Sequence, residues 1–303
     1  MKCLTPPRLA PGDRIGIAAP GGPLRPEPFE RGVSYLEARG FRPIVGKNVG
    51  RRRAYLAGTD RERRDDLNSL IADPEIRAIW CARGGYGSAR IVADLDFEPL
   101  RRHPKALIGY SDITVLQSAV FRKLRLASLY GPLVSELGDP ALFDETSLWK
   151  ALSGDWKELV WSLPAASVHR GGDGEGPLLG GCLSLLVGLV GTPFEPSLEG
   201  AVLFWEEVNE EPYRIDRMLG HLRLAGRLQK LRGMVVGRPV GCEAKDAQND
   251  MPLRDILETH LSGTDYPVVI DFPAGHGPGK VTLPLGRTVR LDTKALSLAV
   301  SGR

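Results

Sequence analysis

A single serine, Ser111, lies where the sequence is best suited to nucleophilic chemistry. It sits in the segment Ile108-Gly109-Tyr110-Ser111-Asp112-Ile113-Thr114, where an apolar strand pattern ends and a helical pattern begins without a spacer. This pattern resembles a nucleophile elbow, which exposes the hydroxyl and surrounds it with backbone N–H groups at a helix N-terminus. The match is partial, because Asp112 and Ile113 stand where G-x-S-x-G needs a second glycine. A simple helix N-cap is the alternative role of Ser111.

A nucleophilic serine needs a base, and His276 is the candidate. It lies in the segment Pro273-Ala274-Gly275-His276-Gly277-Pro278-Gly279, directly after an apolar strand pattern. The neighbouring glycines leave the imidazole accessible at the carboxyl end of a strand, where α/β proteins build their sites. An inert loop histidine is the alternative. The other histidines fall in a turn, in a linker or in helical patterns: His103, His169, His221 and His260.

The base in turn needs a carboxylate to orient it, and two glutamates follow one apolar run. Glu206 comes directly after Ala201–Trp205, so its strand is predicted to be buried on both faces, where a carboxylate is costly without a partner. Glu207 points to the other face, because side chains alternate along a strand. Solvation of both glutamates at the end of the strand is the alternative. The three candidates follow in the order Ser111, Glu206, His276, each at the end of a predicted strand.

The elements that would position these side chains alternate between strands and helices in residues 1–135. This alternation predicts βαβ units on a parallel sheet, an α/β domain that carries the serine. Thr59-Asp60-Arg61-Glu62 is typical of a capping box, and the helix that it opens ends before Pro74. Strands are predicted at 14–19, 41–45, 75–82 and 105–109, and helical apolar faces at 29–36, 67–71 and 113–124.

Residues 136–176 are predicted to be a linker with one short helix around Leu148 and Leu152. The run 171–176 is rich in glycine, which holds regular structure at an entropic cost. Residues 177–303 form the second predicted domain, which carries the glutamate and the histidine. We expect a helix start at 180–186, strands at 201–205, 233–237 and 268–272, a helix at 215–222, and a hairpin or edge strand at 289–300.

The composition is that of an ordinary globular protein, with 42% hydrophobic and 25% charged residues in a chain of 303. A net charge of +3 does not indicate a nucleic-acid partner. We interpret the basic runs 51–53 and 61–64 as solvated faces. Four scattered cysteines indicate neither a zinc site nor a disulfide framework. No segment resembles a signal peptide or a membrane span, which favours the cytoplasm and no membrane partner.

Two glycine-rich segments resemble phosphate-binding loops without matching them. Gly84-Gly85-Tyr86-Gly87 lacks the G-x-G-x-x-G spacing and the lysine of a P-loop. Ala274 to Lys280 ends in Gly-Lys, but an alanine replaces the first glycine and Val281 replaces the serine or threonine that would hold magnesium. We therefore expect no cofactor.

The chain as a whole resembles the LD-carboxypeptidase family, the serine peptidases of murein tetrapeptide recycling. Each matching segment is modest alone, and together they are highly specific. They cover nearly the whole chain in family order: Tyr55–Asp60, Cys81–Gly87, Ile108–Asp112, Gly131–Pro132, Glu206–Val208, Pro212–Arg217, Gly275–Gly277 and Leu283–Gly286.

The resemblance implies roles for particular residues. It implies Ser111 as nucleophile, His276 as base and Glu206 as its orienting acid, with an oxyanion hole from the backbone of Gly85 and Asp112. It also implies a Rossmann-like N-terminal domain, a smaller, mainly β C-terminal domain with helices, a homodimer and no metal. The implied reaction is hydrolysis of the amide between an L-configured centre and a C-terminal D-alanine in a small peptide.

An exopeptidase must also recognise the free carboxylate of its substrate, a bidentate task that suits arginine. Arg83 and Arg214 are candidates, with structural ion pairs as the alternative. Tyr110, beside the serine, is a further candidate for substrate contact. Cys182 is another, because the family usually has Gly-Gly-Asn-Leu where this chain has Gly181-Cys182-Leu183. We expect this exchange of an amide for a thiol to affect substrate choice more than the triad.

Two other functions stay open. Some family members resemble self-immunity peptidases, which cut the amide link of a peptide–nucleotide antibiotic with the same triad and a different pocket. The other is a catalytically silent module that binds murein peptides or nucleotides.

Overall fold

The computed structural model describes residues 3–154, 156–246 and 248–301, which form two compact units. Unit 1 comprises Met1–Trp156 and Pro278–Gly286, and unit 2 comprises Lys157–Gly277 and Arg287–Arg303. The chain therefore leaves unit 1, builds most of unit 2, and returns to unit 1 for one short segment before it ends in unit 2.

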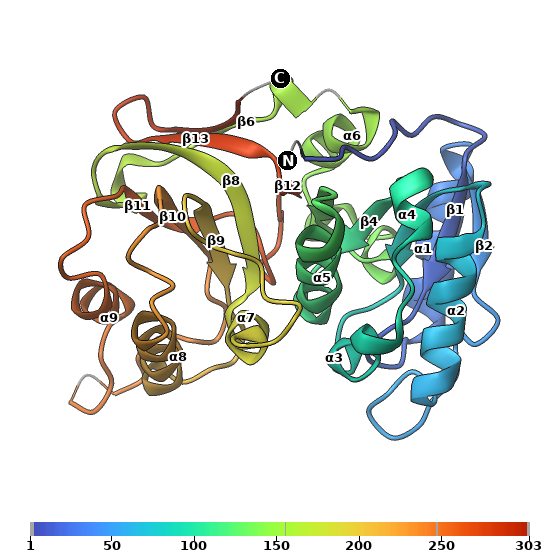
Figure 1. The fold of residues 1–303 in the computed structure, drawn as a ribbon, viewed down its shortest axis with the longest axis horizontal. Coiled ribbons are helices and arrows are strands. Elements are labelled where there is room, and N and C mark those ends of the chain that lie inside the picture. The colour runs from blue at the N-terminus through green and yellow to red at the C-terminus, as the bar shows by residue number, and fades with distance from the viewer. Residues whose placement is uncertain (1–2, 155, 247, 302–303) are drawn as a thin grey trace. The chain divides into compact units, whose positions relative to one another are not determined.

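Unit 1 is built on a six-stranded sheet. Its strands are Arg14–Ala18 (β1), Arg42–Val45 (β2), Ile76–Cys81 (β3), Ala106–Gly109 (β4), Ser128–Tyr130 (β5) and Leu283–Leu285 (β12). Its helices are Pro26–Ala38 (α1), Asp60–Ala72 (α2), Ser88–Ile91 (α3), Pro99–Arg102 (α4), Thr114–Leu124 (α5) and Glu145–Ser153 (α6). The sheet order is β12-β5-β4-β3-β1-β2, in which β1 to β5 are parallel and β12 pairs antiparallel with β5. Figure 1 shows helices α1, α2 and α5 beside these strands.

Local signals account for several of these elements. The hydroxyl of Thr59 accepts the N–H of Glu62, whose carboxylate accepts the N–H of Thr59, which is the predicted capping box at the start of α2. The strands β1, β3 and β4 are almost wholly buried, as strands in a parallel sheet covered by helices must be. Helix α6 confirms the helix predicted around Leu148 and Leu152.

The strand order of unit 1 defines where a ligand is expected. From β1 the chain continues to β2 at one edge of the sheet, and from β3 it continues to β4 in the opposite direction. The boundary between β1 and β3 is therefore a topological switch point. In such folds the loops at a switch point diverge and leave a crevice at the carboxyl ends of the strands, which is the usual ligand position. The loop after β1 and the loop after β3 flank this point, and Ser111 follows the next strand, β4.

Unit 2 contains an eight-stranded sheet with helices. Its strands are Val160–Ser162 (β6), Val168–Arg170 (β7), Asp173–Cys182 (β8), Val202–Glu206 (β9), Gly233–Gly237 (β10), Val268–Phe272 (β11), Thr288–Asp292 (β13) and Ser297–Val300 (β14). Its helices are Leu183–Leu189 (α7), Pro212–Leu224 (α8) and Leu253–His260 (α9). The order is β6-β14-β13-β8-β9-β10-β11-β7, with β8 to β11 parallel. The expected fold class, a parallel α/β unit plus a mainly β unit, is confirmed, as is a hairpin of β13 and β14.

The structure divides the chain differently from the expected 1–135, 136–176 and 177–303. The segment expected as a linker contains α6, β6 and β7 and runs into β8, so it contributes to both units. Two of the glycines that suggested a linker, Gly174 and Gly176, lie within β8, where a side chain would collide with neighbouring backbone. A Cβ on Gly174 would strike the carbonyl of Arg232, and one on Gly176 that of Gly200. Glycine here serves close packing in a strand rather than flexibility.

The second departure concerns the returning segment Pro278–Gly286. It was expected in the C-terminal domain, but β12 pairs with β5 at the edge of the unit 1 sheet through Leu283↔Tyr130 and Leu285↔Ser128. This pairing joins strands about 155 residues apart, and no local pattern encodes such a long-range contact.

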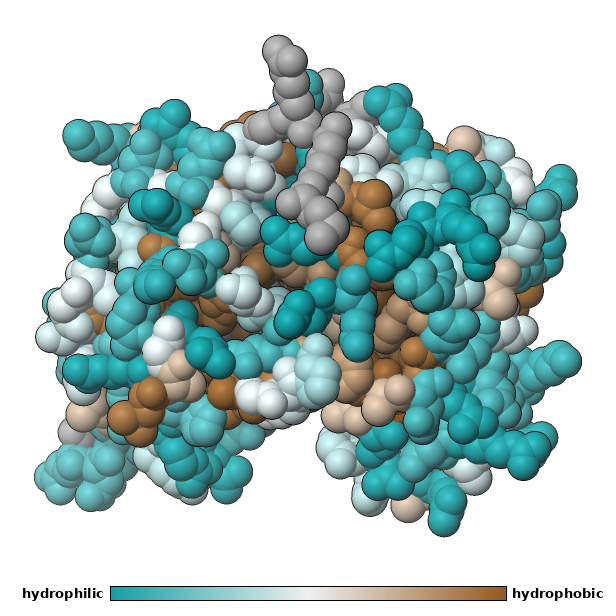
Figure 2. Space-filling view, in the orientation of Figure 1, coloured by the Kyte–Doolittle hydropathy of each residue, from teal (hydrophilic) through white to brown (hydrophobic). Residues whose placement is uncertain are grey.

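The surface shown in Figure 2 is mostly hydrophilic, with smaller groups of hydrophobic residues between the polar ones. Within the described ranges, no helix has the length and apolar character needed to cross a membrane.

Candidate active site

Ser111 occupies a strained turn at the carboxyl end of β4. Its φ is 64°, in the left-handed region that residues other than glycine rarely adopt, while Tyr110 before it is extended at φ −151°. A short 3₁₀ turn, Ser111–Ile113, then leads directly into α5. The strand–turn–helix expected from the sequence is present, and such strain is characteristic of positions that the surrounding structure holds for function.

The loop after β3 packs closely against this serine. A Cβ on Gly84 would lie 3.0 Å from the Cβ of Ser111 and 3.2 Å from its Oγ, so only glycine lets the loop approach this closely. Gly22, in the loop after β1, donates its N–H to the carbonyl of Gly84 at 2.7 Å. Gly85, the expected oxyanion donor, has φ 95° and is exposed. The two loops at the switch point and the serine turn therefore form one assembly within unit 1.

Asp112 fixes this assembly through its side chain. The residue is 1% exposed, and its carboxylate accepts the N–H of Ser88 at 2.9 Å and that of Gly87 at 3.3 Å. The buried acid therefore satisfies the amides at the start of α3 and ties the loop after β3 to the serine turn. This contact explains why an aspartate follows the serine where an ordinary elbow has another residue.

The expectation that the basic run 61–64 is a solvated face is wrong for Arg63, which is buried. Its side chain is only 1% exposed. The guanidinium donates to the carbonyl of Pro20 and, at 2.9 Å, to that of Gly87, and it pairs with Asp60 at 2.5 Å. Arg63 thus joins α2 to both loops of the switch point. Its neighbours Arg61 and Arg64 are the solvated ones, and charge pattern alone does not tell the three apart.

Unit 2 contributes an acid–imidazole pair. Glu206, the last residue of β9, is fully buried, and its Oε2 lies 2.7 Å from Nδ1 of His276. The same oxygen also accepts the backbone N–H of His276 at 3.3 Å. An ionised carboxylate can only accept, so Nδ1 is the donor in this contact, and in the neutral imidazole the lone pair is then on Nε2. This is the tautomer that a general base requires.

Two glycines make room for the Glu206 carboxylate. A Cβ on Gly275, which has φ 107°, would lie 2.5 Å from Oε2 of Glu206. A Cβ on Gly237, the last residue of β10, would lie 2.7 Å from the Cβ of Glu206. The glycine before the histidine therefore lets the backbone of the histidine loop lie close to the Glu206 carboxylate.

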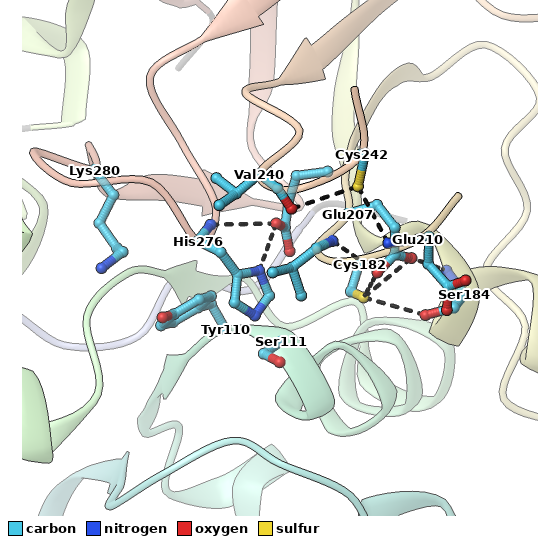
Figure 3. A network of polar contacts seen from close by, with 12 residues as sticks. Tyr110, Ser111, Cys182, Ser184, Glu207, Glu210, Val240, Cys242, His276 and Lys280 are labelled. Carbon is cyan, nitrogen blue, oxygen red and sulfur yellow. Dashed lines mark hydrogen bonds and ion pairs between the residues drawn. The ribbon is translucent and has the colours of Figure 1, made fainter. Parts of the chain in front are cut away.

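Glu207 is buried too, but its carboxylate lies in another cluster. It accepts the N–H of Ser184 at 2.8 Å and that of Val208 at 3.0 Å, and the thiol of Cys182 lies 3.4 Å away. Figure 3 shows Cys182 and Ser184 gathered around this carboxylate. Burial, followed by the charges of Glu207 and Glu206, raises the pKa of the Cys182 thiol well above its usual range. The thiol is therefore a neutral, weak donor rather than a nucleophile.

The expected carboxylate-binding arginines differ in how they are engaged. Arg83 is half-buried in the loop after β3 and donates to the carbonyl of Pro23. Arg214, in α8, is largely exposed and pairs with Glu210 at 3.4 Å and Glu211 at 3.9 Å. Arg214 is therefore engaged in ion pairs, and its contact with substrate stays a prediction. Tyr110 is buried at 6% exposure and faces Tyr130 edge-on, so it contributes to the core of unit 1.

A second acid–imidazole pair provides a contrast within unit 2. Nε2 of His260 lies 2.5 Å from Oδ1 of Asp216, which joins α9 to α8. The Asp216 side chain is 44% exposed, whereas that of Glu206 is 0% exposed. The His260–Asp216 pair joins two helices through a solvated acid, whereas the acid of the Glu206–His276 pair ends a strand and is fully desolvated. In the described part of the chain, no three His, Cys, Asp or Glu residues are grouped as metal ligands would be.

A strained serine after a parallel strand, present in unit 1, and a buried acid–imidazole pair, present in unit 2, are each features of α/β hydrolytic enzymes. Comparison with known proteins narrows this class. Residues 15–131 match the LD-carboxypeptidase N-terminal domain and residues 175–291 the LD-carboxypeptidase C-terminal domain. The chain belongs to the LD-carboxypeptidase family and is a peptidase of that family, which confirms the resemblance drawn from its motifs.

Some of the similar proteins are named murein carboxypeptidases, and others are named MccF. A "Probable murein peptide carboxypeptidase" of Bacillus subtilis is 35% identical over 296 residues, covering 95% of this chain and 91% of the relative. The crystal structure of muramoyltetrapeptide carboxypeptidase from Oxalobacter formigenes has a TM-score of 0.82 at 30% identity, covering 95% and 99%. A structure of MccF in complex with glutamyl sulfamoyl guanosine has a TM-score of 0.90 at 27% identity, covering 100% and 99%.

Proposed function

We propose that this protein is a serine carboxypeptidase that removes the C-terminal D-alanine from murein-derived tetrapeptides by cutting its amide bond to an L-configured centre. The observation that carries the proposal is the 2.7 Å contact between a fully buried Glu206 and Nδ1 of His276. A buried carboxylate is kept where its charge has a task, and orienting a basic imidazole is such a task. The murein carboxypeptidases among the relatives support the choice of substrate.

The proposed mechanism follows acyl transfer through serine. Oγ of Ser111 attacks the scissile carbonyl carbon while Nε2 of His276 takes the hydroxyl proton. The imidazolium then gives this proton to the departing nitrogen as the C–N bond breaks and D-alanine leaves. The same imidazole then takes a proton from water, whose oxygen attacks the acyl-enzyme carbonyl carbon. The ester bond to Ser111 breaks, Oγ takes the proton back from the imidazolium, and the shortened peptide leaves. Glu206 holds the imidazole in its tautomer and stabilises the imidazolium throughout.

The backbone N–H groups of Gly85 and Asp112 are the proposed oxyanion donors. Both residues belong to the loop assembly around Ser111 that the Asp112 carboxylate holds in place. Loss of one such donor typically costs about 10²–10³ in rate. Arg83, one residue before Gly84 in the same loop, is the better candidate for the substrate carboxylate, because Arg214 already faces two acids.

The experiment measures D-alanine release from a murein tetrapeptide together with labelling by a fluorophosphonate. Ser111→Ala and His276→Ala should each lower kcat by about 10⁴-fold or more and abolish labelling. The matched control is His260→Ala, which removes an imidazole also paired with an acid and should leave kcat close to the wild-type value. Full activity in His276→Ala, or equal losses in both histidine variants, would refute the proposed site.

The similarity to MccF keeps a second candidate, cleavage of a peptide–nucleotide amide by the same residues. A parallel assay with an aminoacyl-sulfamoyl nucleoside decides between them. A higher kcat/KM for this compound than for the tetrapeptide would show that the peptide–nucleotide amide, and not the murein peptide, is the substrate. Specific binding of either compound without turnover or labelling would instead support a silent binding module.

The homodimer stays a prediction from the family resemblance, and the cytoplasmic location stays a prediction from the sequence composition. Light scattering of the purified protein and fractionation of the cells that make it would test them.

A further inference from the structure

Lys280 is a buried cation that the proposed mechanism does not use. It ends the Gly-Lys segment that resembled a P-loop, and its side chain is only 3% exposed. Its ammonium donates to Oε1 of Glu136 at 2.9 Å and to the carbonyl of Leu142 at 2.9 Å, all within unit 1. Burying a lysine ammonium costs free energy, so a buried lysine calls for a specific purpose.

Glu136 also contacts Tyr110, the residue beside the serine. Its Oε1 also accepts the hydroxyl of Tyr110 at 2.8 Å, while its Oε2 accepts the N–H of Leu133 at 2.9 Å. The Lys280 ammonium lies 5.1 Å from the centre of the Tyr110 ring, and Figure 3 shows it beside that ring. One carboxylate therefore joins a lysine from the returning segment to a tyrosine of the serine turn.

Tyr110 is extended and Ser111 is left-handed, so the bond between them is where the strain of the turn begins. The Tyr110 side chain is clamped by Glu136, and the N–H of Ser111 donates to the hydroxyl of Tyr130 at 3.3 Å. A strained backbone persists only where its surroundings over-determine it. The Lys280–Glu136–Tyr110 chain supplies part of that constraint.

We propose that Lys280, acting through Glu136 and Tyr110, is a positioning residue that holds Ser111 in its reactive conformation. This inference rests on the proposed function, in which Ser111 is the nucleophile. Lys280 follows His276 by four residues, so it also fixes the chain shortly after the histidine loop as it re-enters unit 1. The effect belongs to the chemical step rather than to substrate affinity.

A purely structural role is the rival explanation, and the chain contains a matched control for it. Lys105 is a second buried lysine of unit 1, 1% exposed, that donates to the carbonyls of Asp73 and Ile76. It precedes β4, whereas Ser111 follows that strand. Lys105→Met therefore removes a buried ammonium at the far end of the same strand, with no link to the serine turn.

The experiment compares Lys280→Met, Tyr110→Phe and Lys105→Met. It measures kcat and KM for the tetrapeptide, the rate of fluorophosphonate labelling, and the urea midpoint of unfolding. Lys280→Met and Tyr110→Phe should each lower kcat and the labelling rate by about 10- to 100-fold with KM nearly unchanged, because a small misplacement of the nucleophile is costly. Lys105→Met should shift the midpoint but leave kcat unchanged. The double variant of Lys280→Met and Tyr110→Phe should be no slower than the slower of these two single variants, since both act through Glu136.

Three results would overturn the inference. Normal kcat and labelling in Lys280→Met would show a structural lysine, and if that variant does not fold, normal values in Tyr110→Phe would do the same. A fall in kcat for Lys105→Met equal to that for Lys280→Met would assign the loss to general destabilisation. A wild-type protein that neither labels nor releases D-alanine refutes the proposed function itself, and the positioning role falls with it.

Discussion

Gly275 and Glu206 approach so closely that the glycine has no room for a side chain. An added Cβ would lie 2.5 Å from Oε2 of the carboxylate, on a backbone whose φ is 107°. The glycine before His276 therefore lets one oxygen accept both the Nδ1 proton and the backbone N–H of the histidine.

Gly275→Ala should accordingly lower both activity and stability. The methyl group would displace the carboxylate from Nδ1, and the backbone strain adds about 1–3 kcal/mol. We expect kcat for D-alanine release to fall by about 10²-fold, the cost of displacing a positioned group by about an ångström. The control is Gly279→Ala, at φ 62° with nothing within 4 Å of the new Cβ, which should lose some stability and little activity. Equal activity in the two variants would contradict the steric argument.

The two adjacent buried glutamates should differ sharply on substitution. Glu206→Gln keeps the shape of the side chain but removes the charge that orients and stabilises the imidazole, so kcat should fall by about 10³–10⁴-fold. Glu207→Gln removes a charge that accepts N–H groups from Ser184 and Val208, so its main effect should be a lower free energy of unfolding. Kinetics and urea denaturation of both variants test this, and the reverse order of kcat losses would assign the orienting role to Glu207.

Much of the candidate site could be predicted from local sequence patterns, because its residues lie where strands end. A hydrophobic strand, a polar residue and a helix start are all short-range features, and they predict the positions of Ser111, Glu206 and His276 at strand ends. Alternation along the strand predicted only that Glu206 and Glu207 point to opposite faces, and the choice of Glu206 came from the family resemblance. The structure places Glu206 against the histidine.

The long-range features could not be read in this way. Arg63 has charged neighbours on both sides, and only the fold shows that it points inward to the carbonyls of Pro20 and Gly87. The glycines of β8 indicate flexibility until neighbouring backbone is known to press against them. Lys280 and Glu136 are 144 residues apart, so their ion pair exists only once the returning segment has joined unit 1.

The Cys182 thiol should resist alkylation. Its pKa is raised, so at every pH the thiolate fraction is smaller than for an ordinary cysteine, and only the thiolate reacts. Iodoacetamide at pH 8.5, followed by peptide mass mapping, should modify the half-exposed Cys3 and leave Cys182 unmodified. In concentrated urea all four cysteines should react. Rapid modification of Cys182 in the folded protein would mean that the thiol is accessible and ionised, against its burial beside Glu207.

Arg63→Lys should weaken the loops around Ser111 although the charge is kept. A lysine presents a compact ammonium, whereas the guanidinium reaches two carbonyls and Asp60 at once, so the variant leaves buried carbonyls without a donor. Each such loss costs about 1–3 kcal/mol. The matched control is Arg64→Lys in the same helix, whose partner is the neighbouring Asp65 and whose side chain is 34% exposed. We expect a lower urea midpoint and a lower kcat/KM for Arg63→Lys alone, because the Gly87 loop also bonds to Asp112 beside the serine. If Arg63→Lys loses stability with unchanged kcat/KM, the loop is held independently of Arg63.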